Sequence, residues 1–310
     1  MTLHRTLTYC LRSLLPAGLA FSLPFGHAAA QSADPVPAAA HAVAAGDAAS
    51  NEGGVFGLGL AYVPRYPGSD RERVRAVPLL EYHWSNGLFV GGERQALLGF
   101  QAAGLSGIRT GIALGVDEGR KAYRDGDLAG QPGIATRPVL ALFAKLRLSA
   151  ALALDGSVRL GSGTDRRGGL LKLQAAYRIP VSPALQLGLQ LDADVANGAY
   201  MRSYFGLRGA SSTMPPLDGR GDSTGNIVAA GPFTSVDLAP GMRYASYAPG
   251  GGLLDVKLGL QMTARLAENY MLLANAGLAR LGKDAADSPF VRQRTSRTLF
   301  VGVARSFGSR

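Results

Sequence analysis

Few side chains in this chain are of the types that catalyse reactions. It holds four histidines and one cysteine in 310 residues, and only His41 and His83 lie beyond the first thirty residues. A Ser/His/Asp hydrolytic site would have to be built on His83, because such a base must lie within hydrogen-bond reach of its nucleophile. His83 also precedes Trp84, and this pair fits the belt of amphipathic rings found at a membrane surface. We favour the second interpretation, and we expect no catalytic residue, no cofactor and no enzyme activity.

Carboxylates could also bind a metal ion near residue 285. Asp284 and Asp287 lie three residues apart and are followed by Ser288, and oxygen ligands of this kind suit a hard cation. The spacing departs from that of a calcium loop, in which alternate positions are acidic. Asp and Ser also form turns by hydrogen-bonding to their own backbone. We therefore expect a turn here and no metal site.

The first thirty residues have the pattern of a secretory signal. Two arginines accompany an apolar stretch at 14–25, and the alanines at 28–30 supply the small residues of a cleavage site. We therefore expect residues 1–30 to be a signal peptide. Residues 31–52 are rich in Ala and Pro, which predicts a flexible periplasmic leader. Cleavage would remove Cys10, so the mature chain would have no thiol for a disulfide or a metal site.

Charge and hydropathy exclude two further classes. The formal net charge of +10 could mark a nucleic-acid-binding protein. The Arg and Lys residues are spread singly along the chain, however, and they accompany an export signal, so we expect no nucleic-acid partner. The mean hydropathy of +0.09 gives more apolar surface than a disordered chain has. Only 17% of the residues are charged, well below the roughly 25% of a soluble domain.

The dominant pattern after the leader is a period of two, which places every second side chain on the same face of a strand. Within residues 184–195, Leu occupies each odd position from 185 to 191, and Gln, Gly and Asp occupy the positions between. Residues 254–266 repeat the alternation. These strands are about ten residues long, which is the length of a tilted strand that crosses a bilayer. A strand of a soluble sandwich usually has only about 5–6 residues.

A bilayer restricts which architectures these strands can form. Every backbone amide in it must be paired within the protein, and a closed sheet has no free edge. The predicted fold class is therefore all-β: a transmembrane antiparallel β-barrel of about 12 strands with extracellular loops, formed by residues 53–310. The expected strands lie near 54–63, 72–84, 87–94, 96–103, 107–117, 136–149, 151–161, 169–179, 184–195, 252–266, 269–281 and 295–307.

A large insertion at 196–251 should lie on the outer side. If residues 200–207 and 242–247 also join the sheet, the barrel has 14 strands, and the sequence leaves this alternative open.

The inward face of the predicted strands carries charges of both signs. The candidate lumen-lining residues are Arg109, Lys145, Arg147, Asp155, Arg159, Lys172, Arg178, Asp192, Asp194, Asp255, Lys257 and Arg265, with Asp117 near the end of its strand. Mixed charge in a lumen of this size fits either a narrow hydrated pore or an interior braced by ion pairs. The basic excess on this face is small, so we expect no strong preference for anions.

Long motifs occur in three segments, at 57–70, 200–206 and 281–289. The loop residues among them are Tyr66, Gly68, Ser69, Asp70, Leu281, Gly282, Asp284, Ala285, Ala286, Asp287, Ser288 and Pro289. In sequence and order these motifs resemble the MipA/OmpV family of outer-membrane proteins, and the resemblance covers residues 54–307. The chain departs from many such barrels at its end, because Phe307 is followed by three further residues instead of ending the chain.

The resemblance implies a non-enzymatic barrel in the outer membrane of a Gram-negative cell, in contact with outer-membrane lipid and lipopolysaccharide. It also implies a scaffold that links murein-remodelling enzymes, a lytic transglycosylase and a murein synthase, to that membrane. Other members of the family are porin-like channels for small solutes, with roles in envelope or antibiotic response. Fold transfers within such a family better than function does, so scaffold and channel both stay open.

Overall fold

The structure is a computed structural model, and it describes residues 52–92, 96–104, 107–120, 128, 133–207 and 247–308. The expected signal peptide and nearly all of the expected leader lie outside the described residues, as does most of the 196–251 insertion.

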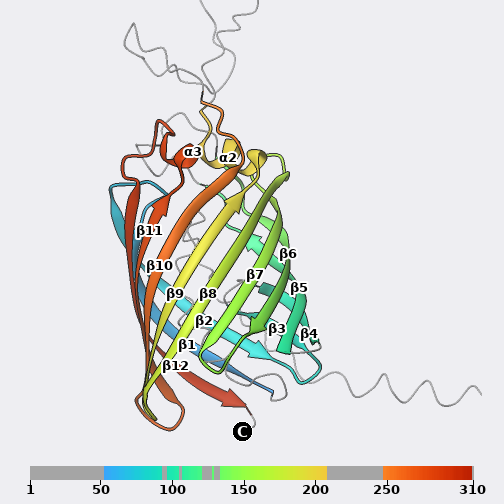
Figure 1. The fold of residues 1–310 in the computed structure, drawn as a ribbon, viewed down its shortest axis with the longest axis vertical. Coiled ribbons are helices and arrows are strands. Elements are labelled where there is room, and N and C mark those ends of the chain that lie inside the picture. Colours follow the sequence, from blue (N-terminus) through green and yellow to red (C-terminus); the bar gives the residue numbers. More distant parts are fainter. Residues whose placement is uncertain are drawn as a thin grey trace, which may run out of the picture.

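Within the described chain, twelve strands form one closed antiparallel barrel (Figure 1). In chain order the strands are β1 (Gly53–Pro64), β2 (Glu72–His83), β3 (Leu88–Gly91), β4 (Ala96–Ala103), β5 (Ile108–Asp117), β6 (Arg137–Arg147), β7 (Leu152–Ser162), β8 (Gly168–Ser182), β9 (Leu185–Ala196), β10 (Gly252–Arg265), β11 (Tyr270–Leu281) and β12 (Thr295–Gly308). Each strand pairs with its neighbours in sequence, and β1 pairs with β12 to close the barrel. The predicted fold class and the count of about 12 strands are confirmed.

The two ends of the barrel differ. Helices α2 (Gly198–Phe205) and α3 (Lys283–Ala286) lie at one end, which we call the helical end (Figure 1). The chain reaches Gly308 at the other end, which we call the turn end, where Gly53 pairs with Gly308. Among the described residues, no helix is long and apolar enough to cross a membrane.

The expected strand at 87–94 was too long. Pairing in this segment is limited to β3, which has only four residues and meets β2 at three of its positions. The chain turns back early because Gly91 and Gly92 adopt positive φ angles of 73° and 76°, a backbone conformation that suits glycine.

The alternative of 14 strands was wrong for residues 200–207, which form most of helix α2. Asn197 caps this helix, and its side-chain oxygen accepts a hydrogen bond from the Tyr200 backbone N–H at 2.9 Å. Leu207 then makes only an isolated bridge to Tyr247. Residues 242–246 of the other expected strand lie outside the described chain.

The outer face of the barrel is apolar, as the alternation predicted. On β1 the outward Phe56, Leu58 and Leu60 are 63%, 61% and 59% exposed, whereas the inward Ala61 and Val63 are buried. Exposed apolar side chains of this kind occur on every long strand. A continuous apolar belt suits a wall that faces lipid.

The inner face is less polar than the alternation predicted. Inward residues of β1, β2, β11 and β12 pack into an apolar cluster around Leu273 and Phe300. The ring of Phe300 occupies the space that a side chain at Gly59 would fill, and the ring of Phe143 does the same at Gly111. Rings therefore fill part of the lumen where glycines of neighbouring strands leave room, which accounts for part of the high glycine content.

Candidate functional site: a capped chamber inside the barrel

A cavity of about 220 Å³ lies in the helical half of the barrel. Strands β5 to β12, the end of β1 with the loop that follows it, helix α2 and the segments next to α3 contribute its lining. Seven of the candidate lumen residues line it: Asp155, Arg159, Lys172, Asp192, Asp194, Asp255 and Lys257. We call this cavity the chamber.

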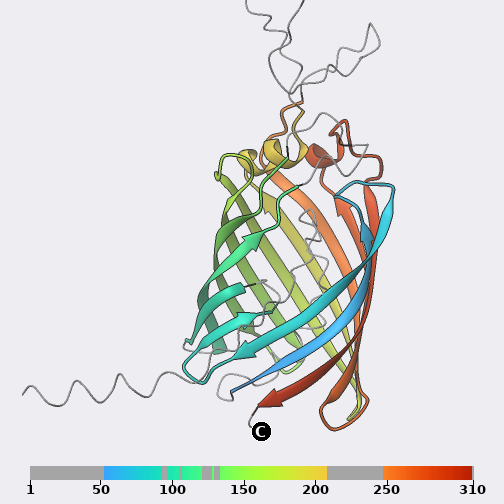
Figure 2. The ribbon, with the colours of Figure 1, turned by 180° about the vertical axis from the view of Figure 1, so that it is seen from behind.

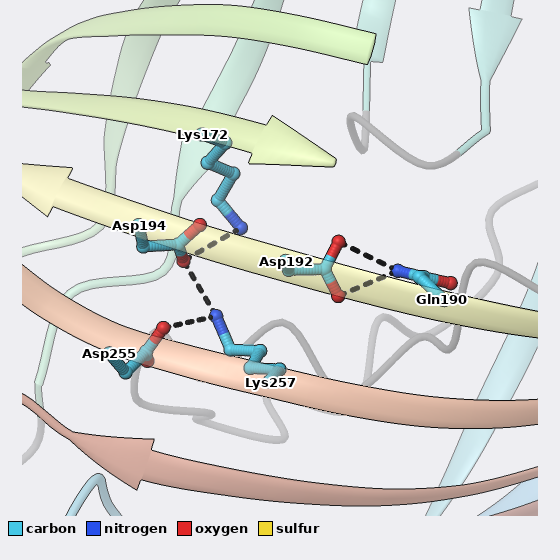
Figure 3. A network of polar contacts seen from close by, with 6 residues as sticks. All are labelled: Lys172, Gln190, Asp192, Asp194, Asp255 and Lys257. Atoms are coloured by element: carbon cyan, nitrogen blue, oxygen red, sulfur yellow. Dashed lines mark hydrogen bonds and ion pairs between the residues drawn. The ribbon is translucent and has the colours of Figure 1, made fainter. Parts of the chain in front are cut away.

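A chain of ion pairs crosses one wall of the chamber (Figure 3). The Lys257 Nζ lies 2.6 Å from Asp194 Oδ2 and 2.9 Å from Asp255 Oδ1. Lys172 approaches the same oxygen of Asp194 to 3.7 Å. Asp194 is only 3% exposed, so these lysines supply the charge compensation that a buried carboxylate requires.

Strand register brings these residues together. Asp194 of β9 lies opposite Lys172 of β8 on one side and opposite Asp255 of β10 on the other. The β9–β10 register shifts between Leu253 and Asp255, and a bulge of this kind re-aims side chains. Leu254 and Asp255 are both buried, so the shift lets two consecutive residues of β10 face the interior.

Amide side chains close the wall toward the turn end. The Gln190 amide donates to both oxygens of Asp192, at 2.9 and 2.8 Å, and the Gln261 amide donates to the Gln190 oxygen. Gln190 and Gln261 are both buried. These contacts favour a braced interior over an unobstructed pore at this level of the barrel.

Helix α2 covers the chamber at the helical end. The Tyr204 hydroxyl donates to both carboxylate oxygens of Asp117, at 2.8 and 2.7 Å. The Arg120 Nη1 donates to the Tyr204 backbone oxygen at 2.8 Å. Burial lowers the pKa of the Arg120 guanidinium from its ordinary value, but a guanidinium remains charged at any physiological pH. Asp117, at the end of β5, therefore holds the helix against the barrel rim.

The three motif segments meet in this cap. The Ser288 hydroxyl donates to the Phe205 backbone oxygen at 2.7 Å, and the Tyr66 hydroxyl donates to the Phe290 backbone oxygen at 3.1 Å. The Tyr247 hydroxyl donates to the Asp284 backbone oxygen at 2.6 Å. Burial raises the pKa of Tyr247, and the nearby carboxylates raise it further. Segments far apart in sequence thus form one structure, which we call the lid.

The other motif residues lie in the same segments and differ in their burial. Ser69, Gly282, Ala285 and Ala286 are buried, whereas Asp70, Asp287 and Pro289 are exposed and Leu281 and Asp284 are half-buried. Gly68 has a φ of +91°, and a side chain on it would collide with Val291. The Asp287 carboxylate pairs with Arg294 at 3.0 Å. Among the described residues, no group of three or more His, Cys, Asp or Glu side chains could hold a metal ion.

The remaining candidate lumen residues lie toward the turn end. Lys145 of β6 pairs at 3.7 Å with Asp155 of β7, which lines the chamber. The other four lie apart from the ion-pair chain. Arg109 is the second residue of β5, Arg147 and Arg265 are the last residues of β6 and β10, and Arg178 lies four residues before the end of β8. The charges are therefore separated along the barrel axis, with most carboxylates in the helical half.

Both ring nitrogens of His83 contact polar side chains, one a carboxylate and the other an amide. Its Nε2 lies 2.7 Å from Glu81 Oε1, its Nδ1 lies 3.3 Å from the Gln101 amide nitrogen, and its ring stacks on Phe89. Sequence reasoning missed Arg120, Tyr204 and helix α2 as parts of the lid. The signal for the helix was present, since Asn197 is a favoured capping residue and the aromatic residues at 200, 204 and 205 recur at helical spacing.

Comparison with known proteins follows this geometry. Residues 56–307 match the family described as MltA-interacting protein MipA. No curated protein sequence matches the chain. Among solved structures, a bacterial polysaccharide outer membrane secretin is similar with a TM-score of 0.39, at 10% identity, over 83% of this chain and 98% of that one. A KdgM porin is similar with a TM-score of 0.34, at 11% identity, over 82% of this chain and 99% of that one. The chain therefore belongs to the family of the MltA-interacting protein MipA, and its fold is a closed antiparallel β-barrel.

Proposed function

We propose that the protein is a non-enzymatic outer-membrane barrel that binds a murein-remodelling lytic transglycosylase at its turn end. The family description names an interaction with MltA for the protein after which the family is called. In barrels of this class the short turns face the periplasm and the longer loops face outward. The turn end carries the short connections between strands, the start of β1 and the end of β12. This arrangement would place the turn end on the periplasmic side, where murein lies.

The observation that carries the proposal is a set of arginines at the turn end, which we call the arginine rim. Its members are Arg109, Arg147, Arg178, Arg265 and Arg305. Arg147, Arg265 and Arg305 are exposed. Three glutamates, Glu52, Glu81 and Glu268, also lie at this end, and Glu81 contacts His83. Five arginines against three glutamates leave an excess of positive charge that would attract an acidic surface.

The test measures binding of purified lytic transglycosylase to the full chain in lipid nanodiscs. The variant Arg147→Glu/Arg265→Glu should weaken binding at least tenfold, and added salt should weaken binding of the unmodified protein because rim charges are screened. The matched control is Arg280→Glu/Arg297→Glu, which reverses two exposed arginines near the helical end. Absence of binding, or equal weakening by both variants, would contradict the proposal.

A second candidate function is passage of small solutes. The chamber favours it, because it is a cavity inside the barrel that is lined by charged side chains. Planar-bilayer recordings test it. Stepwise conductance that changes with Lys257→Glu, on the chamber wall, or with Arg178→Glu, toward the turn end, would support a channel. Silence over many insertions would leave the binding function alone.

A further inference from the structure

Two arginines lie next to each other on the outer face of the barrel, near the helical end. Arg280 is the second-to-last residue of β11, and Arg297 is the third residue of β12. Arg297 lies opposite Leu278 and Arg280 lies opposite Thr295, so the two arginines are diagonal neighbours on adjacent strands. Residues in this relation lie about 7–8 Å apart, within reach of long side chains. We call these two residues the arginine pair.

The arginine pair lies at the upper limit of the apolar belt. In Figure 2, β12 runs beside β1 along the wall from the helical end to the turn end. Its outward Leu299, Val301 and Val303 are 52%, 55% and 44% exposed, and they lie between Arg297 and Arg305. Eight residues span about 27 Å along a strand, or about 20 Å of membrane depth at a tilt of about 40°. The apolar band of a membrane barrel is about 25 Å tall, which places the arginine pair at the depth of lipid head groups.

Both guanidinium groups are available to a ligand. Arg280 and Arg297 are exposed, and neither has an ion pair or a hydrogen bond with another residue in the described part of the chain. Glu72, an acidic residue of β2, is separated from β12 by strand β1. An outward arginine destabilises a barrel within hydrocarbon, and this cost falls toward the membrane interfaces. An anion at the interface would complement the two charges.

The connection between β11 and β12 adds to the positive charge. Lys283, Arg292 and Arg294 are exposed along it. The exposed Asp287 carboxylate is paired with Arg294 at 3.0 Å. Over residues 280–297 the chain carries five basic and two acidic residues. This excess of positive charge attracts anionic lipid to this sector of the barrel.

Apolar side chains lie directly beside and below the arginine pair. Leu278 and Leu299 are 51% and 52% exposed on the same outer face. Tyr62 of β1 lies opposite Leu299 and is 40% exposed. Two cations above an apolar wall fit a ligand that joins an anionic group to acyl chains, and they fit a soluble anion or an acidic protein less well.

We propose that the arginine pair binds a phosphate group of lipopolysaccharide. Guanidinium groups donate paired hydrogen bonds to phosphate oxygens, and two guanidiniums at this spacing can meet one phosphate from two sides. The acyl chains would then lie against Leu278, Leu299 and Tyr62. The proposal takes its orientation from the proposed function, in which the turn end faces the periplasm and the helical end therefore faces the outer leaflet.

The test measures lipid binding to the purified full chain in detergent micelles by native mass spectrometry. Diphosphorylated lipid A, the membrane anchor of lipopolysaccharide, should bind the unmodified protein, and Arg280→Gln/Arg297→Gln should weaken that binding at least tenfold. The matched control is Arg166→Gln/Arg167→Gln, which removes two exposed arginines from the connection between β7 and β8. This control should bind lipid A as the unmodified protein does, because its arginines lie in a loop and not above the apolar wall.

Further arms separate the possible outcomes. Phosphatidylglycerol should bind at least tenfold more weakly than lipid A, because it carries fewer phosphates and acyl chains. Inorganic phosphate at millimolar concentration should not displace lipid A, because the acyl chains add to its binding. The temperature at which the folded gel mobility is lost should be the same for both double variants and the unmodified protein, since the arginine pair makes no ion pair or hydrogen bond with other described residues.

Four results would each overturn the proposal: no binding of lipid A to the unmodified protein, equal weakening by the two double variants, phosphatidylglycerol bound as tightly as lipid A, or displacement by inorganic phosphate. The assay contains no transglycosylase and concerns the opposite end of the barrel from the arginine rim. Its failure is therefore distinguishable from a failure of the proposed function.

Discussion

Lys257→Met should destabilise the barrel strongly, because Lys257 is the main compensation for two buried carboxylates. Its amine lies 2.6 Å from Asp194 and 2.9 Å from Asp255, and these residues are only 3% and 9% exposed. Removing one partner of a buried ion pair costs about 3–5 kcal/mol. The Lys257 side chain is 29% exposed toward the chamber, where water can hydrate the carboxylates, so we expect the lower end, about 3 kcal/mol.

That loss corresponds to a fall of roughly 6–12 °C in the unfolding midpoint, at about 2–4 °C per kcal/mol for a domain of this size. The temperature at which the folded gel mobility is lost measures the midpoint. Urea unfolding in lipid vesicles, followed by Trp84 fluorescence, measures the free energy.

Lys172→Met is the matched control. Lys172 approaches Asp194 only to 3.7 Å, farther than either contact of Lys257, so we expect its removal to cost less, about 1 kcal/mol. The double variant Asp194→Asn/Lys257→Met should lose less than the sum of the two single variants, because the residues share one network. Equal losses for Lys257→Met and Lys172→Met would refute the assignment of Lys257 as the central cation.

Three further outcomes are expected. Tyr204→Phe leaves the buried Asp117 without its two hydroxyl contacts, which should lower the free energy of lid opening by about 1–3 kcal/mol. Proteases should therefore cleave the lid faster, and an unchanged cleavage rate would contradict the role of this contact. Gly59→Val forces the Phe300 ring aside and should lower the free energy of unfolding by about 1–3 kcal/mol, as measured by urea titration. Because the pKa of Tyr247 is raised, its contribution to lid stability is complete below the ordinary tyrosine pKa and is lost as the pH rises through the raised value. The phenolate absorbance of the native protein should therefore exceed that of Tyr247→Phe only at that higher pH.

The sequence predicted the wall of the barrel well. Alternation of Leu with polar residues over 184–195 matches β9, and the other expected strands agree with the structure except near β3. This agreement has a physical basis. The two faces of a wall strand meet different surroundings, the apolar belt outside and the interior inside, so the residue type at each position indicates the face on which it lies. The family motifs likewise marked the segments that form the lid, though as loops.

The candidate site was predicted only in part. The alternation identified Lys172, Asp194 and Lys257 as inward residues but left open whether they line a pore or pair with one another. A period of two gives the face of a strand and not the position along its neighbour. Pairing depends on register, and the shift between Leu253 and Asp255 changes that register locally.

By itself, the sequence determined the strands and the apolar outer belt. Only the tertiary structure decided that rings fill part of the lumen, that Tyr204 meets Asp117, and that the segments around 66, 204 and 288 form one lid. These contacts join residues far apart in the chain. They are fixed when β1 meets β12 and the barrel closes, since closure sets which strands face one another across the lumen and at what height.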